Sequence, residues 1–208
     1  MDSIENESLL HNTITNRIEV ASVPAPDCVC GVTAMAINTL TDTRTRVITG
    51  YDIQQIVQET ALPKGEFNLI LDVVGKKFGI QDVVMTAVID IPLDERQTYQ
   101  LYTSLIDNGG LVLVAVNAKQ WYRIVGYPGP IKEGEHSLLI NGYQTKKNRY
   151  FGNGQSESVF IRDPNLTGQL LVPYDKLRRI MVEDLERHLI VFHNKNNQSI
   201  GEIQIPIP

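Results

Sequence analysis

The spacing of apolar residues changes near the middle of the chain, and this change constrains the fold more than any other feature. Before Asn108 most apolar residues recur at helical spacing, as in the series Val32, Met35 and Leu40. From Leu111 onward the chain consists of short apolar runs bounded by turn residues, which is the pattern of β-strands. A helical first half followed by an antiparallel second half is an α+β layout, with a cleft expected between the two layers.

Individual elements follow from the same patterns. In the first half we expect helices at residues 30–40, 52–57, 69–78 and 94–106, with a strand at 83–89 among them. Asp52 is placed to cap the second helix and Gly79 to end the third. In the second half we expect strands at 111–117, 136–143, 158–164 and 188–194, and a short helix at 174–182. The polar segment 145–158 is expected to be a hairpin loop.

Composition limits the classes of function. A chain of 208 residues with 42% apolar and 21% charged residues is expected to form one globular domain with a real core. The formal net charge of -5, with scattered basic groups, argues against a surface for nucleic acid or anionic membrane.

The first 20 residues differ in composition from the rest of the chain. They are polar, open with acids and contain no long apolar run, so they predict neither a Sec-type signal peptide nor a membrane anchor. We expect residues 1–20 to be a flexible leader or a pro-segment, and residues 21–208 to form the domain. Free thiols without a signal peptide favour a cytoplasmic protein, or an effector exported without a Sec signal.

The chain has two cysteines, Cys28 and Cys30, in the run PDCVCG. Their spacing resists a disulfide, and no second Cys/His pair lies nearby to complete a zinc site. We therefore expect no metal and no organic cofactor. Either one thiol reacts or both are small buried apolar residues.

Cys30 is the better candidate for a reactive thiol on local grounds. A thiol is nucleophilic as the thiolate, and its pKa falls at a helix N-terminus. Cys30 lies in or just before the first turn of the expected helix, and Gly31 would leave room for a substrate backbone. Cys28 lies in the proline-rich approach to the helix and lacks this advantage.

A nucleophilic thiol needs a base and a group that orients the base. Of the four histidines, His11 lies in the leader, and His188 and His193 flank the terminal strand. His136 opens the apolar strand SLLINGY, and Asp163 ends the following strand. If these strands form a hairpin, Asp163 lies beside His136. A strand-end histidine and a turn aspartate before proline are the structural alternatives.

Four segments carry a resemblance to a known family. The segment CGVTAMAINTL is similar to the helix that opens the C39-like peptidases, a branch of the papain-like cysteine peptidases. The segments NGGLVLVAVN, EHSLLINGY and VFIRDPN resemble that family's later strands, in the same order, and the likeness covers about Val23 to Phe192. It implies a papain-like fold, with a helical N-terminal half packed on an antiparallel sheet, and a cysteine peptidase acting on polypeptides in the cleft.

The resemblance also implies a role for each site residue. Cys30 would attack the scissile carbonyl, His136 would move the proton, and Asp163 would orient the imidazole. The backbone N–H of Cys30 and one side-chain donor would bind the oxyanion.

The family usually supplies that donor as a Gln about six residues before the Cys. Pro24 occupies this position here, and no Gln or Asn lies between Val20 and Cys30. Ser22 is the nearest neutral donor in the segment.

Two classes of function stay open on the sequence. One is an active thiol peptidase, or a related acyl-transfer enzyme of deamidase or transglutaminase type. The other is a catalytically impaired papain-like fold that serves as a binding or adaptor module, an outcome that the missing Gln favours. Loops at 121–134 and 146–158 are candidates to line the cleft. Trp121, the only tryptophan, belongs either to the cleft or to the core.

Overall fold

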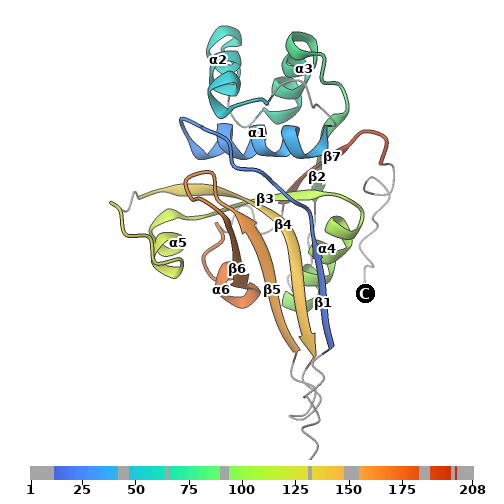
Figure 1. Cartoon of the computed structure of the whole chain (residues 1–208), viewed down its shortest axis with the longest axis vertical. Helices are drawn as coiled ribbons and strands as arrows, with labels where there is room; N and C mark the ends of the chain where they lie inside the picture. Colours follow the sequence, from blue (N-terminus) through green and yellow to red (C-terminus); the bar gives the residue numbers. More distant parts are fainter. Residues whose placement is uncertain are drawn as a thin grey trace, which may run out of the picture.

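The computed structural model describes residues 12–41, 47–63, 66–89, 94–130, 133–147, 155–182, 188–197 and 200. This part of the chain forms a mixed fold of helices and one antiparallel sheet (Figure 1). The helices are α1 (Cys28–Leu40), α2 (Gly50–Thr60), α3 (Phe67–Phe78), α4 (Glu95–Asp107), α5 (Ala118–Ile124) and α6 (Tyr174–Arg178). The strands are β1 (Asn12–Arg17), β2 (Val83–Ile89), β3 (Leu111–Asn117), β4 (Glu135–Lys147), β5 (Gln155–Arg162), β6 (Gln169–Pro173) and β7 (His188–Asn194).

The strands follow the order β2-β7-β3-β4-β5-β6, and β1 pairs with β4 beside this path. Strand β4 is the longest and organises the sheet. Its first half pairs with β3, its second half pairs with β1, and β5 runs along its opposite edge. His136 lies near the start of this strand.

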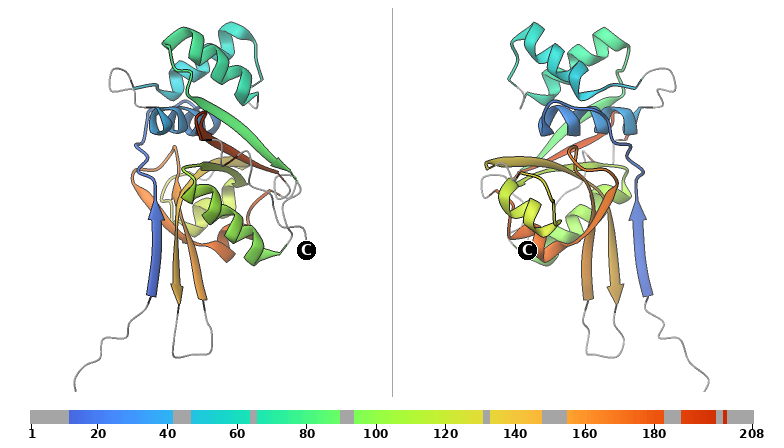
Figure 2. Two further views of the ribbon diagram at one scale, coloured as in Figure 1. Left: turned by 90° about the vertical axis from the view of Figure 1, so that its right-hand side faces the viewer. Right: turned by 60° about the vertical axis from the view of Figure 1, so that its left-hand side comes forward.

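The sheet separates two hydrophobic cores. Helix α1 packs on one face, with α2 and α3 beyond it, while α4, α5 and α6 lie on the other side (Figures 1 and 2). Strand β3 shows why both faces are covered. Leu111 and Leu113 point into the core under α1, whereas Val112 and Val114 point into the core with α4 and α5. The alternation of a β-strand thus supplies both cores from one apolar run.

Short-range capping rules set the ends of the helices. Asp27 accepts the backbone N–H of Cys30 and begins α1, and Gly79, with a φ of 73°, ends α3. The expectation that Asp52 caps the second helix was wrong. Thr49 is the N-cap there, and Asp52 is the acidic partner in a reciprocal capping box.

Strands β2, β3 and β7 have the bounds that the sequence predicts, and α3 and α4 lie within two residues of theirs. Three elements were missed. Strand β1 is polar, α5 is one short helix inside an expected loop, and β6 is a five-residue strand. The expected hairpin loop 145–158 is shorter, because β4 and β5 extend into it, and its centre lies outside the described residues.

The expected flexible leader is also revised in part. Residues 12–17 form β1, Ile18 donates its N–H to the carbonyl of Asn141, and Val20 is buried. This portion is therefore part of the folded sheet, and residues 1–11 lie outside the described residues. Within the described part of the chain, no helix combines the length and the apolar character that crossing a membrane requires.

At Gly31, α1 packs closely against the loop that follows Asp163. A Cβ at Gly31 would lie 2.4 Å from the Cβ of Pro164 and 3.1 Å from that of Ala25. The residue is buried, so its role is close packing rather than room for a substrate backbone.

We therefore expect Gly31→Ala to lower the free energy of unfolding by about 1–3 kcal/mol, as overpacking does. Alanine otherwise favours a helix over glycine by about 1 kcal/mol. Chemical denaturation measures the change. In a Pro164→Gly background the cost should shrink, because the colliding methylene is gone; an equal cost in both backgrounds would contradict the packing role.

Candidate active site

The site begins at the first residue of α1. Asp27 precedes the helix, and its carboxylate and carbonyl accept the N–H groups of Cys30 and Gly31 at 2.8 and 3.0 Å. Cys28 therefore occupies the first helical position, where backbone N–H groups favour a negative charge. Its side chain is partly exposed, whereas Cys30 is fully buried.

Cys28 lies against the start of β4. Burial raises the pKa of its thiol, but a hydrogen bond with His136, hydrogen bonds from the backbone and side chain of Ser137, and the charge of His136 lower it. The pKa of Cys28 ends below its ordinary value. The geometry thus favours the thiolate.

Asp163 holds the other side of the imidazole. Its Oδ1 accepts the Nε2–H of His136 at 2.9 Å and the backbone N–H of Asn165 at 2.7 Å. Its Oδ2 accepts the indole N–H of Trp121 at 2.6 Å. Because Nε2 is engaged by Asp163, Nδ1 is the ring nitrogen left for Cys28. A fully buried carboxylate with three donors has a fixed orientation, and it fixes the tautomer of His136.

The charge state of His136 follows from these neighbours. Burial lowers its pKa, but the hydrogen bonds to Asp163 and Cys28 and the negative charges of both raise it, to about 9. The imidazole is therefore protonated at neutral pH. Together with the lowered pKa of Cys28, this favours a thiolate–imidazolium pair.

Aromatic side chains cover the imidazole. The Tyr122 ring lies 5.3 Å from that of His136, centroid to centroid, and the Tyr127 ring lies 4.8 Å from Tyr122. The Tyr122 hydroxyl is 3.5 Å from Nε2 and accepts a hydrogen bond from the Asn165 amide at 2.8 Å. Burial raises the pKa of Tyr122, so this group stays a neutral hydroxyl beside the pair.

The structure brings together two of the three predicted residues and buries the third, Cys30, away from them. His136 and Asp163 meet as the hairpin argument predicts, since β4 and β5 are paired. Cys28, not Cys30, contacts His136. The helix begins two residues earlier than expected, and two residues correspond to about 200° around a helix, so Cys30 points to the opposite side. It lies in the core with Val32 and Ile53.

The two predicted oxyanion donors, the Cys30 N–H and the Ser22 hydroxyl, are affected by this shift of the helix start. The Cys30 N–H already donates to Asp27, so it is not available to a substrate. Ser22 is exposed on the segment that leads to α1. The signal that would have identified Cys28 is the aspartate before it, because Asp is a preferred N-cap and makes the next residue the first of the helix.

Trp121 belongs to the core, one of the two placements considered. It is fully buried on α5, but its indole N–H makes it a partner of Asp163. Among the other histidines, His193 is buried and its Nε2 lies 2.8 Å from the Thr86 hydroxyl across β2 and β7. His188 opens β7, and His11 lies outside the described residues.

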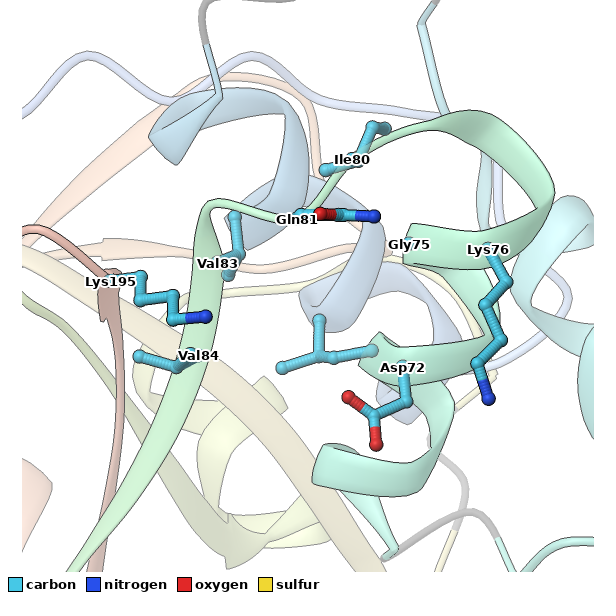
Figure 3. Close-up of a pocket in the computed structure, with 9 residues that line it drawn as sticks. Asp72, Gly75, Lys76, Ile80, Gln81, Val83, Val84 and Lys195 are labelled. Atoms are coloured by element: carbon cyan, nitrogen blue, oxygen red, sulfur yellow. The ribbon is translucent and has the colours of Figure 1, made fainter.

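A separate hollow of about 220 Å³ lies between α3 and the start of β2 (Figure 3). Apolar side chains of Leu71, Ile80 and Val83 line it, with Lys76 and Lys195 at its margins. Asn194, the residue before the lining residue Lys195, donates to the carbonyl of Leu40, the last residue of α1. The hollow is therefore near the end of α1 opposite to Cys28, about 20 Å along the helix. None of the described residues that line it carries a thiol or an imidazole. In the part of the chain that is described, no group of three or more His, Cys, Asp or Glu side chains is arranged to hold a metal ion.

Replacing Trp121 by Phe keeps the aromatic packing and removes one donor to a buried carboxylate. We expect the free energy of unfolding to fall by about 1.5–3 kcal/mol, the range for hydrogen bonds to charged groups. Denaturant titration measures it. In an Asp163→Asn background the same replacement should cost less; an unchanged cost would assign the loss to packing alone.

The raised pKa of His136 predicts a pH dependence. An NMR titration of its ring protons should give a midpoint near 9, which moves toward about 6.5 in Asp163→Asn. A raised folded-state pKa stabilises the fold fully below about pH 6.5, and this contribution is lost as the pH rises through 9. In a Cys28→Ala background one cause of the raised pKa is absent, so the stability advantage of His136 over Gln should narrow between about pH 6.5 and an upper limit below 9. A midpoint near 6.5 in the wild type would contradict the ion pair.

Comparisons with solved structures give a likeness in fold but none in sequence family. No family model and no curated protein matches the sequence. The fold is similar to the crystal structure of a Bacillus anthracis protein provisionally described as a C39-like peptidase, with a TM-score of 0.46 and 14% sequence identity. The match covers 85% of this chain and 97% of that one.

Proposed function

We propose that this chain is a papain-like cysteine peptidase in which Cys28 is the nucleophile, His136 the acid and base, and Asp163 the orienting carboxylate. One observation carries the proposal. A partly exposed thiol at the first residue of a helix is hydrogen-bonded to a buried histidine, which is itself bonded to a fully buried aspartate. Nucleophile, base and orienter in contact are the arrangement that covalent acyl transfer requires.

The chemistry follows from the charges. The Cys28 thiolate attacks the carbonyl carbon of a peptide, and the His136 imidazolium gives its proton to the leaving amine nitrogen as the C–N bond breaks. The acyl group is then held on Cys28 as a thioester. Neutral His136 takes a proton from water, which attacks the thioester and releases the acid, and the thiolate–imidazolium pair is restored.

The oxyanion would be bound at the start of α1. The Asp27 cap uses the N–H groups of Cys30 and Gly31, and the N–H of Cys28 precedes them in the first turn. With Cys28 as nucleophile, the position six residues upstream is Ser22 rather than Pro24. The Ser22 hydroxyl is therefore the proposed side-chain donor.

Surroundings of the pair support a peptidase over an inert fold. Tyr122 lies beside the buried imidazole and Trp121 binds the buried carboxylate, while Cys28 stays partly exposed. Two buried groups of opposite charge cost folding free energy unless they are paired, and a third charged group beside them raises that cost. Structural stability alone does not call for such an arrangement. The substrate class is a polypeptide that reaches Cys28 from its exposed side.

Alkylation by iodoacetamide, located by mass spectrometry across pH, tests the nucleophile. We expect rapid modification of Cys28 at pH 6, lost in His136→Ala, and slow modification of the buried Cys30. Cys28→Ser should lower the cleavage of denatured protein substrates, followed through new N-termini, by at least about 10³-fold. Cys30→Ala is the matched control and should keep both properties. Faster modification of Cys30, or labelling of Cys28 only near pH 8.5, would refute the proposal and favour a binding module.

A further inference from the structure

Strand β4 changes its partner at Asn141. On one edge, residues up to Ile140 pair with β3 and residues from Gly142 onward pair with β1. On the other edge the register with β5 skips one residue, since Ile140 faces Ile161 and Gly142 faces Phe160. Asn141 is therefore the extra residue of a β-bulge. Bulges of this kind re-aim a side chain and end or redirect pairing.

The Asn141 side chain is directed at the N-terminal segment. The side-chain Nδ2 donates to the carbonyl of Ile18 at 2.6 Å, and the main-chain carbonyl of Asn141 accepts the Ile18 N–H at 2.8 Å. The residue is fully buried, and its Oδ1 has no hydrogen-bond partner among the described residues. A buried amide with an unsatisfied oxygen costs folding free energy. What Asn141 provides in return is the two-way clamp on Ile18.

The neighbouring glycine opens the space for β1. A Cβ on Gly142 would lie 2.7 Å from the carbonyl oxygen of Asn16 and 3.0 Å from the Cα of Arg17. Asn16 in turn donates to Asp107 at 2.7 Å, and the same carboxylate accepts the Tyr143 hydroxyl. Asn141 and Gly142 thus form the docking site on β4 for residues 12–18.

The N-terminal segment continues from this docking site to Cys28, the proposed nucleophile. Arg162 Nε donates to the carbonyl of Val20 at 2.6 Å, and Arg162 is the residue before Asp163. Val20 and Val23 are buried, and the carbonyl of Pro24 accepts the Gly50 N–H at 2.8 Å. The chain from β1 to the cap of α1 is therefore attached to β4, which carries His136, and to β5, which ends directly before Asp163.

We propose that residues 12–20 are a permanent positioning strap, held by Asn141 and Arg162, that sets Cys28 against His136 and Asp163. The strap gives Cys28 a direct connection to the two strands that carry its partners, in addition to the packing of α1. It excludes the removal of residues 1–20 as a pro-segment; a processing cut would have to precede Asn12. This inference rests on the proposed function, because it takes Cys28 as the nucleophile.

Two single variants on different strands test the strap. Asn141→Ala removes the donor to Ile18, and Arg162→Met removes the donor to Val20 while keeping an unbranched side chain. A displacement of about 1 Å at a reacting group can cost about 10²-fold in rate. We expect both variants to reduce Cys28 alkylation at pH 6 and kcat by about 10- to 100-fold, with a smaller change in KM and a cooperative thermal transition. Arg162→Lys should restore part of the loss.

Matched controls separate positioning from general damage. Arg179→Met removes a surface arginine that bonds only to exposed Asp175 among its described ion pairs, and should leave both readouts unchanged. A deletion of residues 2–11 should also leave them unchanged, whereas a deletion of residues 2–18 should reproduce the loss. If Asn141→Ala does not fold, the partly exposed Arg162 carries the test.

The outcomes distinguish this inference from the proposed function. Wild-type Cys28 that shows no labelling at pH 6 refutes the peptidase and the strap together. Wild-type Cys28 that labels at pH 6, with strap variants that keep its pH profile and kcat, overturns the strap alone. Loss of folding in Arg162→Met also overturns it, because Arg162 would then serve global stability rather than positioning.

Discussion

The site depends on one buried carboxylate. Asp163 lies directly after β5 and accepts hydrogen bonds from three places: His136 on β4, Trp121 on α5 and the backbone of Asn165. Each bond fixes a different element, so the carboxylate holds helix, strand and loop in one arrangement. A charge in this environment is tolerated only while its donors stay in place. The same three hydrogen bonds therefore stabilise the buried charge of Asp163 and fix the position of the His136 ring.

The Cys28 side of the site is held by the start of α1. Asp27 ends the approach segment, caps the helix and leaves Cys28 at its first position. Gly31 lets the helix pack on Pro164, the residue after Asp163. Helix α1, which carries Cys28, and the loop after Asp163 are thus joined by direct packing as well as through His136. In the proposed strap, Asn141 and Arg162 add a second connection between the same parts.

Local patterns predicted the elements that are strongly periodic or strongly apolar. Strand β3 is an unbroken apolar run because both faces are buried, and α3 ends at a glycine with positive φ. The polar strand β1 has no such pattern, because its pairing is determined by the bulge at Asn141 and the glycine after it on a distant strand. Helix α5 was missed because seven residues are too few to show a helical period.

The sequence by itself determined the α+β layout, because alternation and helical spacing are local properties. It predicted the contact of His136 with Asp163 on the condition that their strands form a hairpin, and the structure meets this condition. It placed a cysteine at the start of a helix, but chose the wrong one of two. Asp27 before Cys28 is a local signal for the start of the helix, but only the tertiary structure shows which thiol faces His136. The two thiols are separated by about 200° around α1, and which of them faces His136 depends on how that helix packs across the sheet.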